Sequence, residues 1–256
     1  MNTTQCPRCK KFFASRQRLQ SHLSRKTPCE NNKIINVNKG GRPPKIKEEI
    51  PNNDFKVNSK IHLSLDENTG NSTVLFGSSK SGKSTLLMHL YKKYYKKTIS
   101  VLFTESPQIK LYKDKNLIIS PIFFTEVIKE MHLINKGTNN HYDFTVLLDD
   151  IVDQKNNVAV KKLILILRNS NISSIVSLQS PKLLAKENRG SVNNYCFFKF
   201  NSNEMITEII QLFLSPYLPP KKMDDKIKLY KKLTEDHKFI YLDILNDKIS
   251  IHKINI

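Results

Sequence analysis

From about residue 60 onward, short apolar runs alternate with longer stretches of mixed polarity. These runs are rich in β-branched and aromatic side chains, which is typical of buried strands. We predict strands at residues 72–76, 99–103, 116–120, 144–148, 173–178 and 194–200. Helical spacing predicts helices after residue 84 and over 122–135, 158–168 and 220–234, and residues 239–254 predict a hairpin turning at Asn246-Asp247 as an added edge. Strands that alternate with helices predict an α/β domain with a parallel sheet.

The first 60 residues lack this pattern and divide into two parts. Residues 31–60 contain Asn pairs, Gly40-Gly41 and Pro43-Pro44, with few large apolar side chains, which is a linker composition. We therefore expect a small module at 1–30, a basic linker at 31–60 and the main domain at 61–256.

The small module contains the spacing of a zinc site. Cys6 and Cys9 are two residues apart, His22 follows after twelve more, and Cys29 after a further six. Two thiolates from one turn, a histidine from a helix and a further thiolate suit tetrahedral Zn²⁺. The segment resembles the ββα zinc finger family, with Phe13 and Leu19 at its core positions, but its last ligand is a Cys after a longer spacing. Such a finger binds either nucleic acid or protein.

Charge extends the case for a polyanionic partner. Lys and Arg number 42 against 23 Asp and Glu, a net charge of +19, and residues 1–60 hold 14 of the basic residues and four of the acidic ones. Part of the Lys excess fits AT-rich coding bias. Gly41-Arg42-Pro43-Pro44-Lys45 resembles an AT-hook without its first Arg; the alternative is a stiff basic linker.

The same sequence argues against a membrane protein and against a secreted protein. No apolar run approaches the roughly 18 residues that span a bilayer, and the N-terminus has no signal-peptide stretch. We therefore expect an intracellular protein without a membrane partner. The fourth cysteine, Cys196, lies within a predicted strand and is expected to be a buried apolar filler.

A phosphate-binding motif follows the first predicted strand. Residues 77–84, GSSKSGKS, match GxxxxGKS between a strand and a helix, the context that this P-loop motif requires. Backbone N–H groups of such a loop cradle phosphates at a helix N-terminus. We expect Lys83 to reach the β- and γ-phosphates of ATP, Ser84 to bind Mg²⁺ and Thr85 to touch the α-phosphate. The predicted nucleotide-binding residues are Gly77, Ser78, Ser79, Lys80, Ser81, Gly82, Lys83, Ser84 and Thr85.

Acidic and amide side chains follow two later strands. Asp149 and Asp150 come directly after residues 144–148, and Gln179 follows 173–178. We assign Asp149 to Mg²⁺, Asp150 to the general base that polarises water, and Gln179 to the γ-phosphate or that water. The alternative is that they are solvated strand ends. At least one strand intervenes between the P-loop strand and the acidic strand, which points to the additional-strand, RecA-like P-loop ATPases.

Together, the segments GSSKSGKST, TVLLDDIVD and SIVSLQSP and the pair Arg189 and Asn193 resemble the FtsK/HerA superfamily. The similarity is to the genome-packaging ATPases of poxviruses, other large DNA viruses and virophages. It implies ATP-driven movement of double-stranded DNA into a capsid by a homo-oligomeric ring, expected to be a hexamer. It also implies capsid or portal-vertex proteins as partners, in a cytoplasmic viral factory or the virion.

Ring motors of this class commonly complete the site with an arginine from a neighbouring subunit. After position 42 the chain has only Arg168 and Arg189, each before a predicted strand, and we expect both near the sheet edge that carries the acids. The alternative is that they cap helix C-termini.

Three other functions stay open. A HerA-like repair translocase or helicase would carry the same motifs. A zinc-finger DNA-binding regulator could hold a vestigial P-loop domain. A small-molecule kinase is disfavoured, because nucleotide kinases usually close an Arg-rich lid and residues 61–256 contain two arginines.

Overall fold

The computed structural model describes residues 4–5, 12–13, 20, 56–106, 109–150, 157–219 and 221–254. The chain forms two units, Met1–Glu49 and Ile50–Ile256. In the first, β1 (Thr4–Gln5) pairs antiparallel with β2 (Phe12–Phe13), as the hairpin of a ββα finger would. The four predicted zinc ligands and the AT-hook-like segment lie outside the described residues, so the zinc finger stays a prediction.

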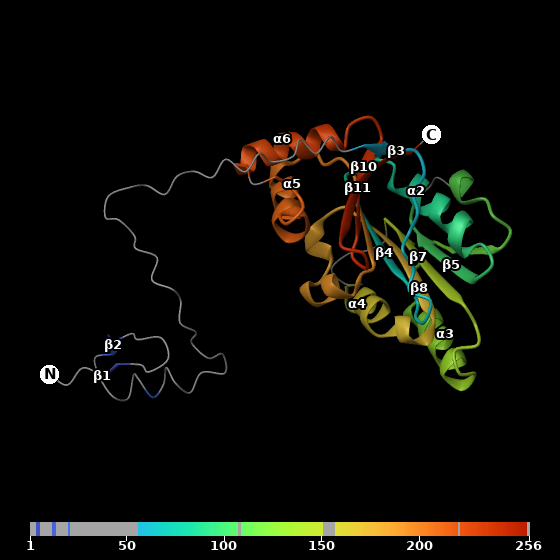
Figure 1. Ribbon diagram of the computed structural model, residues 1–256. Coiled ribbons are helices and arrows are strands. Elements are labelled where there is room, and N and C mark those ends of the chain that lie inside the picture. The colour runs from blue at the N-terminus through green and yellow to red at the C-terminus, as the bar shows by residue number, and fades with distance from the viewer. Residues whose placement is uncertain are drawn as a thin grey trace. The chain divides into compact units, whose positions relative to one another are not determined.

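The second unit is built on one nine-stranded sheet (Figure 1). In spatial order its strands are β3 (Val57–Asn58), β11 (Lys248–Lys253), β10 (Lys238–Asp243), β9 (Asn194–Phe197), β4 (Ser72–Phe76), β8 (Ile172–Leu178), β7 (Phe144–Asp149), β5 (Ile99–Thr104) and β6 (Leu117–Ser120). Every pair from β9 to β6 is parallel. The parallel sheet predicted from the alternation of elements is therefore confirmed.

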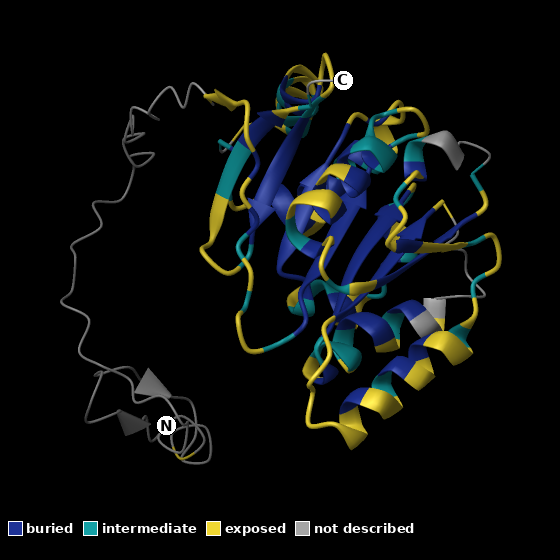
Figure 2. Cartoon of the chain, turned by 90° about the vertical axis from the view of Figure 1, so that its right-hand side faces the viewer, coloured by how far each residue is buried: buried dark blue, intermediate teal, exposed yellow. Residues whose placement is uncertain are grey.

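Helices cover both faces of the sheet because successive strand residues point to opposite sides. On one face, Leu75 of β4 packs in a core with α2 (Lys83–Leu90) and the π-helical turn Tyr91–Tyr95 that continues it. On the other, Val74 and Phe76 pack in a core with the remaining helices. These are α3 (Thr125–Gly137), α4 (Asn157–Leu165), α5 (Asn203–Ile209) with its continuation Ile210–Leu214, and α6 (Met223–Leu233). The central strands are accordingly dark blue between helices with yellow outer surfaces (Figure 2).

Two details differ from the sequence pattern. The strand that separates the P-loop strand β4 from the acidic strand β7 is β8, whereas β5 and β6 lie beyond β7. The C-terminal hairpin pairs Asp243 with Lys248, so its turn contains the predicted Asn246-Asp247. However, the two-residue β3 lies outside it, in the stretch assigned to the linker. β3 was missed because two residues give no periodic signal.

Two smaller expectations also have an outcome. Cys196 is fully buried in the core beside α2, as a filler would be. Within the described ranges, none of the helices combines the length and apolar character needed to cross a bilayer.

Candidate nucleotide-binding site

The loop between β4 and α2 has the backbone of a phosphate cradle. Gly82 at the start of α2 has a φ of 103°, and Lys80 has a φ of 60°. A Cβ on Gly77 would lie 2.6 Å from Ser81 Oγ and 2.7 Å from Phe198 Cβ, so only glycine fits there. The first N–H groups of α2 have no partner within the helix, and they face outward with the positive end of its dipole. The loop can therefore bind an anion.

Lys83 is held inside this loop. It is 4% exposed, and its Nζ donates to the carbonyl oxygens of Gly77 at 2.9 Å and Ser78 at 3.0 Å. Burial lowers the pKa of the ammonium, while the nearby carboxylates of Asp150 and Asp149 act in the opposite direction. An ammonium has three N–H donors, and two are used by the loop. The third is free to donate to a phosphate oxygen.

Asp149 is the last residue of β7 and is fully buried. Its Oδ2 accepts a hydrogen bond of 2.6 Å from the hydroxyl of Tyr112. Its Oδ1 is also buried and has no hydrogen-bond partner in the structure as described. A buried carboxylate oxygen without a partner is costly unless a ligand satisfies it. Together with the Ser84 hydroxyl it offers the hard oxygen donors that Mg²⁺ prefers, so these residues fit the ion.

Tyr112 was not predicted from the sequence. It ends the short 3-10 turn Ile109–Tyr112 and is fully buried. Burial, followed by its hydrogen bond to Asp149, raises the pKa of Tyr112 to about 12, while Ser84 and Thr104 lower it in part. The phenol therefore stays protonated and remains a donor to Asp149.

Asp150 and Gln179 meet at the ends of β7 and β8. Asp150 Oδ1 accepts a hydrogen bond of 3.0 Å from Gln179 Nε2, and both side chains are exposed. Asp150 has a φ of 53°, a conformation that costs a non-glycine residue about 1–3 kcal/mol and is concentrated at functional sites. The two predicted residues are thus brought into direct contact.

A cleft of about 480 Å³ joins these parts. It is lined by Ser79, Lys80, Ser81, Gly82, Lys83, Ser84, Thr85, Glu105, Ser106, Leu111, Asp150 and His237. The P-loop and the predicted base therefore share one cavity. Glu105 could have been found, since it follows the strand at 99–104, whereas His237 follows a helix and carries no sequence signal.

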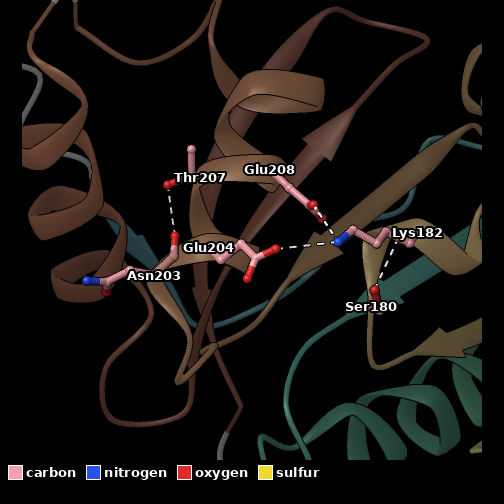
Figure 3. A network of polar contacts seen from close by, with 6 residues as sticks. All are labelled: Ser180, Lys182, Asn203, Glu204, Thr207 and Glu208. Carbon is pink, nitrogen blue, oxygen red and sulfur yellow. Dashed lines mark hydrogen bonds and ion pairs between the residues drawn. The ribbon is translucent and has the colours of Figure 1, made fainter.

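The segment after Gln179 is tied to helix α5 (Figure 3). Ser180 Oγ accepts from the backbone N–H of Lys182. The Lys182 ammonium lies 3.5 Å from a carboxylate oxygen of Glu204 and 3.1 Å from one of Glu208. Ion pairs this exposed stabilise the fold little, but they fix where the chain runs after the cleft.

The two candidate arginines lie elsewhere. Arg168 precedes β8, and its Nη1 donates to the carbonyl of Ser191 at 3.1 Å. Arg189 precedes β9, with its guanidinium carbon 5.8 Å from the Phe213 ring centre. Since β8 and β9 are both parallel to β4, residues before them lie at the sheet edge opposite the cleft. The expectation that both sit at the acidic edge is wrong; their role in a neighbouring subunit stays a prediction.

Comparison with known proteins extends the description of the fold. No family model and no curated protein matches the sequence. Among solved structures, B204, the DNA-packaging ATPase of Sulfolobus turreted icosahedral virus, has 15% identity and a TM-score of 0.55, over 73% of this chain and 100% of that one. B204 of turreted icosahedral virus 2, in complex with AMPPCP, has 16% identity and a TM-score of 0.53, over 73% of this chain and 98% of that one.

A secretion ATPase is similar to a lesser extent. The cytoplasmic domain of the type VII secretion ATPase EccC of Thermomonospora curvata has 13% identity and a TM-score of 0.51, over 75% of this chain and 24% of that one. At such identities the likeness establishes the fold, a mostly parallel α/β sheet of the kind found in P-loop packaging ATPases.

Proposed function

We propose that this chain hydrolyses ATP to move double-stranded DNA, and that it packages a viral genome into a capsid. The observation that carries the proposal is the shared cleft, where the P-loop lysine and Asp150 line one cavity and Gln179 donates a hydrogen bond to Asp150. A P-loop alone would bind nucleotide. A carboxylate held by an amide beside it adds what is needed for hydrolysis.

Each residue has a distinct task in this mechanism. The loop N–H groups and Lys83 bind the phosphates, and Ser84 and Asp149 would hold Mg²⁺. When bound, Mg²⁺ supplies positive charge to the phosphates. Asp150 orients the attacking water and accepts its proton, while the Gln179 amide fixes the direction of that carboxylate.

Charge supports DNA as the polymer that is moved. The chain carries a net +19, and 14 of its basic residues lie in the first 60 positions. Such an excess binds phosphates without reading sequence. Likeness to B204 over the whole length of that ATPase supports packaging over repair as the process. We expect a homo-oligomeric ring, with capsid or portal-vertex proteins as further partners.

The N-terminal module would serve as a zinc-dependent tether to DNA or protein. With Cys6, Cys9, His22 and Cys29 as ligands, the purified chain should contain about one Zn²⁺ per subunit. Removing it with a zinc-selective chelator, with Mg²⁺ kept in excess, should weaken DNA binding and leave basal ATP hydrolysis unchanged, since the cleft lies in the other unit. A metal-free chain that binds DNA normally would contradict the tether.

The test of the proposed function is ATP hydrolysis with and without duplex DNA. Wild type should hydrolyse ATP faster with DNA. The affinity for DNA should fall with salt concentration, at a slope of about −0.9 per neutralised phosphate on a log–log plot, so the stimulation should weaken steeply as salt is added. Lys83→Ala should abolish both rates. A rate that duplex DNA leaves unchanged would refute DNA-coupled hydrolysis.

A further inference from the structure

We propose that Tyr112 is a positioning residue that orients Asp149 toward Mg²⁺. The inference rests on the proposed ATPase function and names a residue that the P-loop and acidic motifs do not contain. It also assigns a role to the turn Ile109–Tyr112, which joins the core to the wall of the cleft.

The contact joins residues that are far apart in the sequence. The Tyr112 hydroxyl donates to Asp149 Oδ2 at 2.6 Å across a separation of 37 residues, and both residues are fully buried. The Tyr112 ring packs in the same core as Leu86 and Leu87 of α2. The phenol is therefore fixed by packing before it meets the carboxylate.

A fixed donor determines which oxygen of Asp149 is free. The terminal torsion of an aspartate is broad, so a carboxylate without partners has no single orientation. Tyr112 engages Oδ2, and Oδ1 is left buried and unpartnered among the residues described. Tyr112 thus contacts Asp149, one of the two residues that would hold the ion.

The same turn contacts the cleft. Leu111, the residue before Tyr112, lines the cavity together with Lys83 and Ser84. A nucleotide that packs against Leu111 would therefore press on the turn that holds Asp149. Tyr112 would therefore couple the binding of the nucleotide to the binding of the metal ion.

The chain offers a matched control. Tyr91 is also fully buried, on the same face of the sheet, but its hydroxyl has no hydrogen-bond partner in the described structure. Tyr91→Phe and Tyr112→Phe remove the same atom from the same core. Only the second removes a hydrogen bond to a carboxylate.

The experiment titrates full-length protein with a fluorescent, non-hydrolysable ATP analogue at a series of Mg²⁺ concentrations and in EDTA. Tyr112→Phe should raise the Mg²⁺ concentration for half-maximal binding by about 10-fold or more, since hydrogen bonds to charged groups contribute roughly 1.5–3 kcal/mol. Affinity in EDTA should be unchanged, as should both values in Tyr91→Phe. In turnover, kcat should fall at saturating Mg²⁺ more than the KM for ATP rises.

A double-mutant cycle with Asp149→Asn tests the route of the effect. If Tyr112 acts through Asp149, the double variant should require the same Mg²⁺ concentration as Asp149→Asn alone. Additive losses, or an unchanged Mg²⁺ requirement in a Tyr112→Phe protein that melts as a folded domain, would overturn the inference. Wild type that binds no nucleotide would instead overturn the proposed function.

Discussion

Polar side chains at the two ends of the parallel strands differ in their hydrogen bonding. We call the end of the sheet where these strands begin the amino edge, and the end where they finish the carboxyl edge. At the amino ends of the strands, Asn193 Oδ1 accepts from the N–H of Ser72, and the Asn135 amide donates to the carbonyls of Tyr142 and Ser170. At the carboxyl ends, Asp149 Oδ1 and Ser81 Oγ are buried without a partner in the structure as described. In these examples the polar side chains at the amino ends are hydrogen-bonded, whereas the two atoms at the carboxyl ends are not, although Thr73 Oγ1 within β4 is also buried without a partner among the described residues.

A turn at the amino edge, Lys186–Ser191, differs from these examples. Both amide atoms of Asn188 and the Nε of Arg189 are buried and have no hydrogen-bond partner among the described residues. Arg168, by contrast, donates to Ser191. If open polar groups mark places where another molecule binds, the turn Lys186–Ser191 is such a place and Arg189 is the better candidate for a shared arginine.

The largest expected effect comes from replacing Arg189. Arg189→Ala subunits and Asp150→Asn subunits should each be nearly inactive, since an arginine of this kind contributes about 10³–10⁵ in rate. Mixed together, they should regain turnover at interfaces that pair an intact arginine with an intact acid. The same mixture with Arg168→Ala is the control. No recovery with either arginine would mean that the site is not shared between subunits.

The next largest effect comes from replacing the polar residues at the carboxyl edge, Asp150 and Gln179. Asp150→Asn should keep ATP affinity near wild type and reduce turnover about 10²–10⁴-fold, because an amide cannot accept the proton of the attacking water. Gln179→Ala should also bind ATP but hydrolyse it more slowly, because the Asp150 carboxylate loses the amide that orients it. Near-normal turnover in Asp150→Asn would show that the base is wrongly assigned.

The smallest effect comes from replacing Asn193 at the amino edge. Asn193→Ala leaves the buried N–H of Ser72 without its acceptor, so the free energy of unfolding should fall by about 1–3 kcal/mol. The rate per folded molecule should be unchanged. Asn116→Ala, at an exposed position, should change stability by less than about 0.5 kcal/mol. Loss of turnover in Asn193→Ala without loss of stability would contradict a purely structural amino edge.

The sequence predicted the parts of the molecule that depend on local pattern. The strand, loop and helix around Lys83 are contiguous, and a carboxylate at the end of a buried strand marks Asp149 and Asp150 without any knowledge of the sheet. Contacts across the sequence were beyond reach. Nothing local indicates that Tyr112 meets Asp149, 37 residues away. Arg168 and Arg189 were placed at the wrong edge because residues before and after parallel strands lie at opposite ends.

The central claim is that ATP hydrolysis at the carboxyl edge moves duplex DNA. Displacement of a third strand from a DNA triplex tests this claim directly. Wild type should release the third strand with ATP and should not do so with a non-hydrolysable analogue. Asp150→Asn should bind the DNA and leave the triplex intact. If wild type hydrolyses ATP and the third strand stays bound, the chain does not translocate duplex DNA and the account is wrong.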